Sequence, residues 1–143
     1  MRRLPAIASL ALLLLAHAAA ARGLVVIANP ASGVDKLSRD DAVNIFMGRY
    51  RKLPSGIVAF PIDIGSDSST RKEFYNLLVD KDTAEVDAYW ARLVFSGQTS
   101  PPLQVPDEKT AVELVAGNRS AIAYVDRDRV NSRVKVVLEL ETR

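Results

Sequence analysis

The feature that most constrains the fold is the alternation of short apolar runs with amphipathic helical patterns. The runs are brief and rich in β-branched residues, as in strands buried on both faces of a sheet. They occupy residues 24–28, 57–62, 121–125 and 134–140. Helical patterns begin near residues 38, 69, 83 and 107, and turn-forming residues separate them from the runs. Strands separated by helices predict an α/β domain, with a mainly parallel sheet flanked by helices.

The first 21 residues have the pattern of a cleaved secretory signal peptide. Arg2 and Arg3 form a basic start, an apolar Leu-rich stretch follows, and the alanines at 18–21 provide a cleavage site. The apolar stretch is shorter than the roughly 20 residues that cross a membrane. We therefore expect residues 1–21 to be a signal peptide, residues 22–143 to form one domain, and the exported protein to have no stable membrane anchor.

Composition excludes several function classes. The chain has 19 Lys+Arg and 17 Asp+Glu, so loss of Arg2 and Arg3 with the signal peptide leaves equal charges and no argument for nucleic-acid binding. There is no cysteine, and the single histidine, His17, lies in the signal peptide. These absences exclude Ser–His and Cys–His catalysis and ordinary zinc sites. Because no nucleotide-binding glycine pattern occurs either, we expect no enzyme, no cofactor and no metal.

The second apolar run leads through a Gly-, Ser- and Asp-rich loop directly into a helical pattern. The N-terminus of a helix presents free N–H groups and a positive dipole end, which suit an anion. We therefore predict a ligand site made of Ser68, Ser69, Thr70 and Arg71, with Arg71 as counter-charge. The same residues also fit a simpler interpretation, in which Ser68 only caps the helix and Arg71 is a surface charge.

Trp90, the only tryptophan, is expected to anchor the core.

Several segments together resemble phosphate-type periplasmic substrate-binding proteins. LSRDDAVNIFMG (residues 37–48) is similar to the family's LSRDDLxxIFLG segment. SSTRKEFY (68–75) resembles its SGTxxxF phosphate loop, and AYWARLVFSG (88–97) resembles the YWARLVFTG segment of short, stand-alone relatives. AIAYV (121–125) is similar to GAIGYV. The segments follow the family order and cover nearly all of residues 22–143.

The resemblance implies a single lobe of a type 2 periplasmic-binding protein. It implies a periplasmic module that binds phosphate or a similar oxyanion weakly, in association with an ABC transporter. Ser68 and Thr70 fall on family hydroxyl ligands, Ser69 replaces the intervening glycine, and Ile64 stands where the family has its phosphate-gripping arginine. The alternative is a periplasmic interaction or sensor domain that kept the lobe but lost the ligand. A lone lobe exposes the surface its missing partner would cover, so a homodimer is also an open interpretation.

Overall fold

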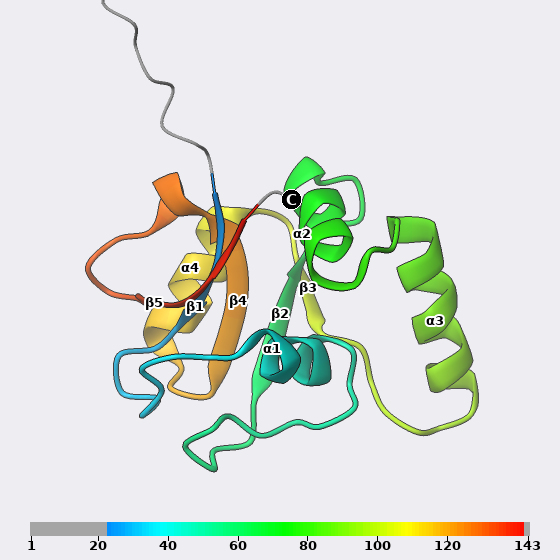
Figure 1. Cartoon of the computed structure of the whole chain (residues 1–143), viewed down its shortest axis with the longest axis horizontal. Coiled ribbons are helices and arrows are strands. Elements are labelled where there is room, and N and C mark those ends of the chain that lie inside the picture. The colour runs from blue at the N-terminus through cyan, green and yellow to red at the C-terminus, as the bar shows by residue number, and fades with distance from the viewer. Residues whose placement is uncertain (1–22, 142–143) are drawn as a thin grey trace, which may run out of the picture.

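The computed structural model describes residues 23–141, so the expected signal peptide lies outside the described residues. A five-stranded sheet with helices on both faces makes up the domain (Figure 1). In chain order the elements are β1 (Leu24–Ala28), α1 (Arg39–Phe46), β2 (Phe60–Ile64), α2 (Ser69–Val79), α3 (Thr83–Phe95), β3 (Leu103–Val105), α4 (Glu108–Gly117), β4 (Ala121–Asp126), the 3₁₀ turn η1 (Arg127–Arg129) and β5 (Lys135–Leu140).

The strand order across the sheet is β3-β2-β4-β1-β5. β2 is parallel to β3 and β4, whereas β1 is antiparallel to both β4 and β5. Four strands therefore run in one direction, and the prediction of a mainly parallel sheet flanked by helices is confirmed. None of the helices within residues 23–141 combines the length and the hydrophobicity of a membrane-spanning segment.

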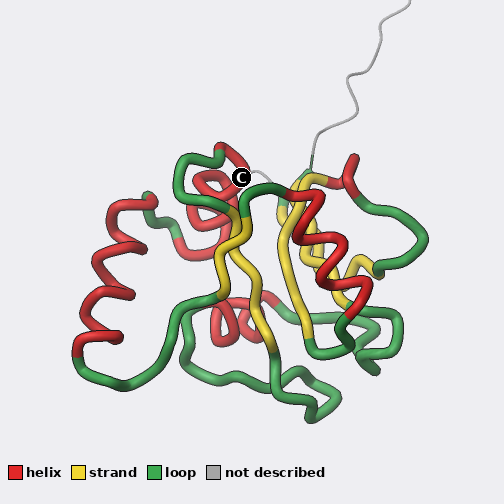
Figure 2. Tube along the Cα trace, turned by 180° about the vertical axis from the view of Figure 1, so that it is seen from behind, coloured by secondary structure: helices red, strands yellow, loops and turns green. Residues whose placement is uncertain are grey.

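The sheet separates two apolar clusters, and β1 contributes to both. Leu24, Val26 and Ala28 belong to the cluster under α1 and α2, while Val25 and Ile27 belong to the cluster under α4. A strand covered on both faces has no polar positions, which is why its sequence is a continuous apolar run. Figure 2, seen from behind, shows α4 across the sheet and α3 standing out to one side.

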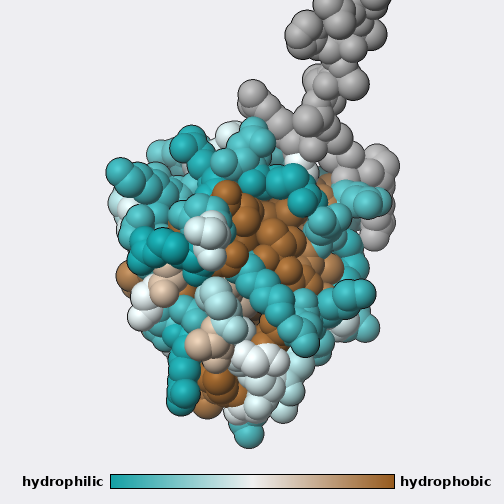
Figure 3. All heavy atoms as spheres, turned by 90° about the vertical axis from the view of Figure 1, so that its left-hand side faces the viewer, coloured by the Kyte–Doolittle hydropathy of each residue, from teal (hydrophilic) through white to brown (hydrophobic). Residues whose placement is uncertain are grey.

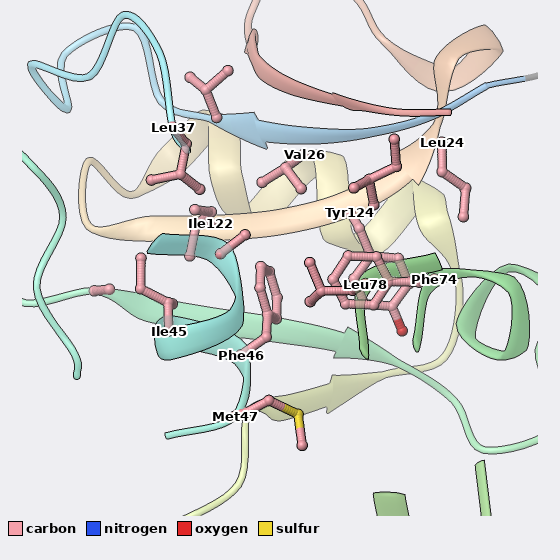
Figure 4. Close-up of a cluster of buried hydrophobic side chains, with 14 of the residues drawn as sticks. Leu24, Val26, Leu37, Ile45, Phe46, Met47, Phe74, Leu78, Ile122 and Tyr124 are labelled. Atoms are coloured by element: carbon pink, nitrogen blue, oxygen red, sulfur yellow. The ribbon is translucent and has the colours of Figure 1, made fainter. Parts of the chain in front are cut away.

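An aromatic group fills the centre of the cluster under α1 and α2 (Figure 4). Phe74 of α2 stacks on Tyr124 of β4 with ring centroids 3.7 Å apart, and Phe46 of α1 meets Phe74 edge-on. Trp90 of α3 is also buried, which confirms its predicted place as a core anchor. Gly48 lies against the Trp90 ring, where a Cβ atom would come within 2.5 Å of it. Gly48 has φ +71° and follows the end of α1, where a glycine commonly ends a helix.

Two strand predictions are wrong in detail. The second strand is Phe60–Ile64 rather than 57–62, because residue 57 closes a turn with Leu53 and Val58 forms only an isolated bridge with Lys52. The strand β3 is not among the predicted strands. It lies in the connection between α3 and α4. It has only three residues, Leu103, Gln104 and Val105, so its apolar–polar alternation is too short to indicate a strand.

Candidate functional site

Helix α2 begins directly beyond the carboxyl end of β2, as the strand–loop–helix pattern predicts. Ser68 is its N-cap, and the Ser68 hydroxyl accepts the Arg71 N–H at 3.3 Å. The Ser68 N–H in turn donates to the Gly65 carbonyl at 2.9 Å. The capping role of Ser68 is thus confirmed, and its hydroxyl serves the helix. The first two N–H groups of an α-helix have no partner within the helix, so those of Ser69 and Thr70 remain available for a ligand.

Ser69 and Thr70 line a polar hollow of about 380 Å³ at this edge of the sheet. The other lining residues come from the start of α4, the end of β4 and η1: they are Glu108, Asp126, Asp128 and Arg129. The N-termini of α2 and α4 therefore meet at the same hollow, which adds two positive dipole ends to it.

Charged groups in this hollow are already partly paired with one another. Glu108 lies 3.6 Å from the Arg129 guanidinium and accepts the Asp126 N–H at 2.6 Å. The Asp126 carboxylate accepts the Asp128 N–H at 3.0 Å. The hollow thus combines N–H and hydroxyl donors from α2 with carboxylate acceptors from the opposite wall. It suits a small polar molecule that both accepts and donates hydrogen bonds.

Arg71 is directed away from this hollow and into the protein. Successive residues of an α-helix diverge by about 100°, so Arg71 and Thr70 project from different sides of α2. The Arg71 side chain is only 2% exposed. Its Nε lies 3.1 Å from Asp63 and its Nη2 lies 2.8 Å from Asp87. The four predicted residues are therefore distributed over three environments: the cap, the hollow and a buried ion pair.

Asp63 of β2 is the centre of that buried network, and the sequence analysis missed it. Its carboxylate accepts hydrogen bonds from Arg71 Nε, from the hydroxyls of Tyr75 and Tyr124, and from the Ile64 N–H. These donors come from α2, β4 and β2 itself, so one side chain ties three elements together. A signal was present in the sequence: Asp63 lies between two isoleucines, where a charge needs buried partners.

The network fixes the protonation states of its members. Burial and the negative charge of Asp63 raise the pKa of Tyr75 and of Tyr124 well above the ordinary tyrosine value. Burial alone would lower the pKa of Arg71, but the neighbouring Asp63 and Asp87 carboxylates raise it above its usual range. Both tyrosines consequently keep their protons and donate to Asp63, while Arg71 stays charged.

Ile64 stands where the similar family has an arginine, and it adds no positive charge to the polar hollow or to the Asp63 network. Its side chain is buried and belongs to the apolar cluster under α1 and α2. Within residues 23–141 there is no group of three or more acidic or histidine side chains arranged to hold a metal ion. The candidate site therefore rests on Ser69, Thr70 and the polar wall opposite them.

Solved structures of phosphate-binding proteins share this fold. An ABC-type phosphate transport receptor from Vibrio cholerae aligns with 81% of this chain and 45% of its own, with a TM-score of 0.64 and 20% identity. A putative phosphate ABC transporter substrate-binding protein with bound phosphate, from Clostridium perfringens, aligns over 81% and 44% at TM-score 0.66 and 20% identity. PstS from Borrelia burgdorferi aligns over 81% and 46% at TM-score 0.62 and 13% identity.

The predicted resemblance is thus confirmed at the level of the fold, which is that of a periplasmic-binding-protein lobe. The chain spans less than half the length of these solved proteins. The Vibrio cholerae protein is a transport receptor and the Clostridium perfringens protein is a putative transporter substrate-binding protein, so neither is described as an enzyme. No protein-family model matches the sequence, and sequence comparison found no similar curated protein.

Proposed function

We propose that this chain is a periplasmic solute-binding module that takes phosphate, or a similar oxyanion that retains a proton, at the hollow lined by Ser69 and Thr70. The observation that carries the proposal is the position of these two residues, at a helix N-terminus on the carboxyl edge of the sheet. The common fold with a phosphate-bound protein from Clostridium perfringens supports it. Ser69 and Thr70 contact the ligand, Ser68 caps α2, and Arg71 holds α2 in place through Asp63.

The acidic wall of the hollow determines which oxyanion it prefers. Sulfate has only acceptor oxygens at neutral pH, so Asp126 and Asp128 repel it. Hydrogen phosphate keeps a P–OH group, which donates to one of these carboxylates while its other oxygens accept from α2 and Arg129. Hydrogen bonds that involve a charged group are worth about 1.5–3 kcal/mol each. Because a single lobe leaves the ligand partly in water, we expect micromolar affinity at best.

Isothermal titration of residues 22–143 with phosphate and with sulfate tests this proposal. We expect saturable heat with phosphate and much weaker heat with sulfate. Thr70→Val, which removes the hydroxyl while keeping the side-chain shape, should weaken phosphate binding. Thr83→Val is the matched control, because Thr83 also lies in the first turn of a helix but not at the hollow. Absence of heat at millimolar phosphate, with the fold intact by circular dichroism, would overturn the proposal.

Export and partnership need separate measurements. Fractionation of cells that produce the whole chain should recover a shortened protein in the periplasm if residues 1–21 are a cleaved signal peptide.

The similar proteins from Vibrio cholerae and Clostridium perfringens are described as parts of ABC-type phosphate transport. Co-purification with a phosphate transporter would therefore support the same role here, and its absence under phosphate starvation would count against it.

A second candidate function, an interaction or sensor domain, is favoured by exposed apolar side chains on α3. Phe95 is 96% exposed, and the neighbouring Val94 is also exposed. Neighbouring apolar side chains that are exposed in this way can form a contact site for another protein. Light scattering coupled to gel filtration separates a homodimer from a monomer. Phe95→Ser should dissociate a dimer that uses this surface and should leave phosphate binding unchanged.

A further inference from the structure

A second hollow, of about 620 Å³, is lined by Arg71 and shares no lining residue with the hollow of Ser69 and Thr70. One wall is the inner side of α3, and the other is formed by β2, β3 and the segment before β3. In Figure 1, α3 stands to one side of β3, and the chain that connects them runs below both. This volume is within the range of small-molecule sites. The lining residues that matter here are Asp87, Trp90, Val94, Phe95 and Pro102.

Two of the side chains that line this hollow each carry a buried hydrogen-bond donor with no acceptor among the described residues. These donors are Nη1 of Arg71 and Nε1 of Trp90. Each belongs to a side chain more than nine-tenths buried. Folded proteins rarely leave buried donors unpaired, and a charged donor is the more costly case. Both atoms indicate that the hollow receives a molecule with a hydrogen-bond acceptor.

Arg71 is held differently at its two ends. Its Nε is fixed to the buried Asp63 carboxylate at 3.1 Å. The outer end is held only by Asp87, through Nη2, and the Asp87 side chain is 57% exposed. Asp87 can therefore turn into water while the buried Asp63 remains paired with Arg71. Once it turns away, Nη1 and Nη2 form the planar fork that binds a carboxylate with two hydrogen bonds.

We propose that this hollow binds a small organic acid with an apolar body, whose carboxylate replaces Asp87 on Arg71 and accepts the Trp90 Nε1 hydrogen. The exchange of one carboxylate for another leaves the charge around Arg71 unchanged. The apolar body packs against Trp90, Val94, Phe95 and Pro102. A dianion such as phosphate is disfavoured here, because it adds charge next to Asp63 and has no apolar part for these walls.

Trp90 provides the measurement, because it is the only tryptophan and lines the hollow. Intrinsic fluorescence of residues 22–143 is titrated with 3-phenylpropionate, with its neutral analogue 3-phenylpropionamide, and with inorganic phosphate. We expect a saturable change with the acid and at least a tenfold weaker response to the amide, since the amide cannot form the charge-assisted pair. Phosphate should neither change the fluorescence nor compete with the acid.

Variants at Asp87 and Arg71 test the exchange itself. Asp87→Asn removes the competing carboxylate and should tighten binding of the acid about two- to fivefold, the range set by an exposed ion pair. Glu85→Gln, on the same helix but outside this hollow, is the control and should have no effect. Arg71→Lys keeps the charge but loses the fork, and should abolish binding. If that variant does not fold, the comparison of Asp87→Asn with Glu85→Gln still decides the outcome.

Three results would overturn this inference. The first is no saturable change with millimolar 3-phenylpropionate in either the unaltered protein or Asp87→Asn. The second is equal binding of the acid and the amide, which would mean an apolar groove without a carboxylate site. The third is loss of acid binding in Thr70→Val, which would place the acid in the phosphate hollow. Failure of phosphate to bind leaves this inference standing, because Thr70 and Arg71 face different hollows.

Discussion

Thr70 and Arg71 are adjacent in α2, yet they lie in opposite environments. Thr70 lines an open polar hollow, whereas the Arg71 side chain is 2% exposed and bonded to Asp63. The difference follows from helix geometry, which separates neighbouring side chains by about 100°. A run of consecutive polar residues at a helix start can therefore offer its N–H groups to one ligand but not all of its side chains.

The two environments also differ in how much their charges matter to stability. In the hollow, the Arg129–Glu108 pair involves an exposed arginine, and such pairs are worth about 0–1 kcal/mol. Around Asp63, removing one partner of a buried pair typically costs about 3–5 kcal/mol, because the remaining charge is left without compensation. The hollow is thus suited to exchange with solvent and ligand, while the Asp63 network holds β2, α2 and β4 together.

The largest expected effect is that of Asp63→Asn. The substitution keeps the shape but leaves Arg71 without its buried counter-charge, so we expect a loss of about 3–5 kcal/mol in the free energy of unfolding. Urea denaturation followed by circular dichroism measures it. Asp128→Asn, in the open hollow, is the control and should change stability by less than about 0.5 kcal/mol. Similar losses in the two variants would remove the distinction between the two regions.

Arg71→Met should cost somewhat less, about 2–4 kcal/mol, because Tyr75, Tyr124 and the Ile64 N–H continue to donate to Asp63. From the sequence alone, Arg71 is expected to be an accessible cation whose removal costs little stability. Arg92→Met, on the exposed side of α3, is the comparison. A loss for Arg71→Met as small as that for Arg92→Met would show that the buried ion pair does not form in solution.

Alkaline pH should destabilise the Asp63 network in particular. Unfolded tyrosines lose their protons near pH 10, whereas the raised pKa values of Tyr75 and Tyr124 keep these two protonated in the fold. Above about pH 10 the unfolded state therefore binds fewer protons, and stability falls by up to about 1.4 kcal/mol per pH unit for each tyrosine. Tyr75→Phe should reduce this slope. Denaturation curves between pH 8 and about 11 measure it, and an unchanged slope in the variant would contradict the assignment.

The smallest expected effect is that of the helix cap. Ser68→Ala removes the acceptor of the Arg71 N–H and should cost about 1 kcal/mol. Ser38→Ala, at the capping box of α1, should cost a similar amount. Because the Ser68 hydroxyl serves α2, phosphate affinity should change little in Ser68→Ala. A large loss of phosphate affinity with little loss of stability would instead make Ser68 a direct ligand.

Exposed charges and buried groups also contribute differently to stability over the rest of the molecule. In Figure 3, the side that carries β5 and the chain from η1 to β5 presents an apolar area set among hydrophilic side chains. Ion pairs between exposed groups occur around β5, including Arg127 with Glu139 at 2.6 Å. Such pairs keep this face soluble without adding much stability. Most of the stability must therefore come from the two apolar clusters and the Asp63 network.

Features that depend only on neighbouring residues can be predicted from the sequence of this protein. The apolar run of β1, the start of α1 near residue 38 and the Ser68 cap were predicted where the structure has them. The placement of Ser69 and Thr70 at the start of α2 followed from the same local rules. These features need only a few consecutive residues, so their chemistry can be read directly.

The partners of each charged group depend instead on how distant elements pack. Asp63, Arg71 and Asp87 are separated by eight and then sixteen residues, and their contact depends on how β2, α2 and α3 pack. The strand β3 likewise exists because β2 offers it an edge, not because of its own pattern. A sequence shows that a buried charge needs a partner, but the fold determines which groups come within hydrogen-bonding distance. For Arg71, the fold supplied two carboxylates.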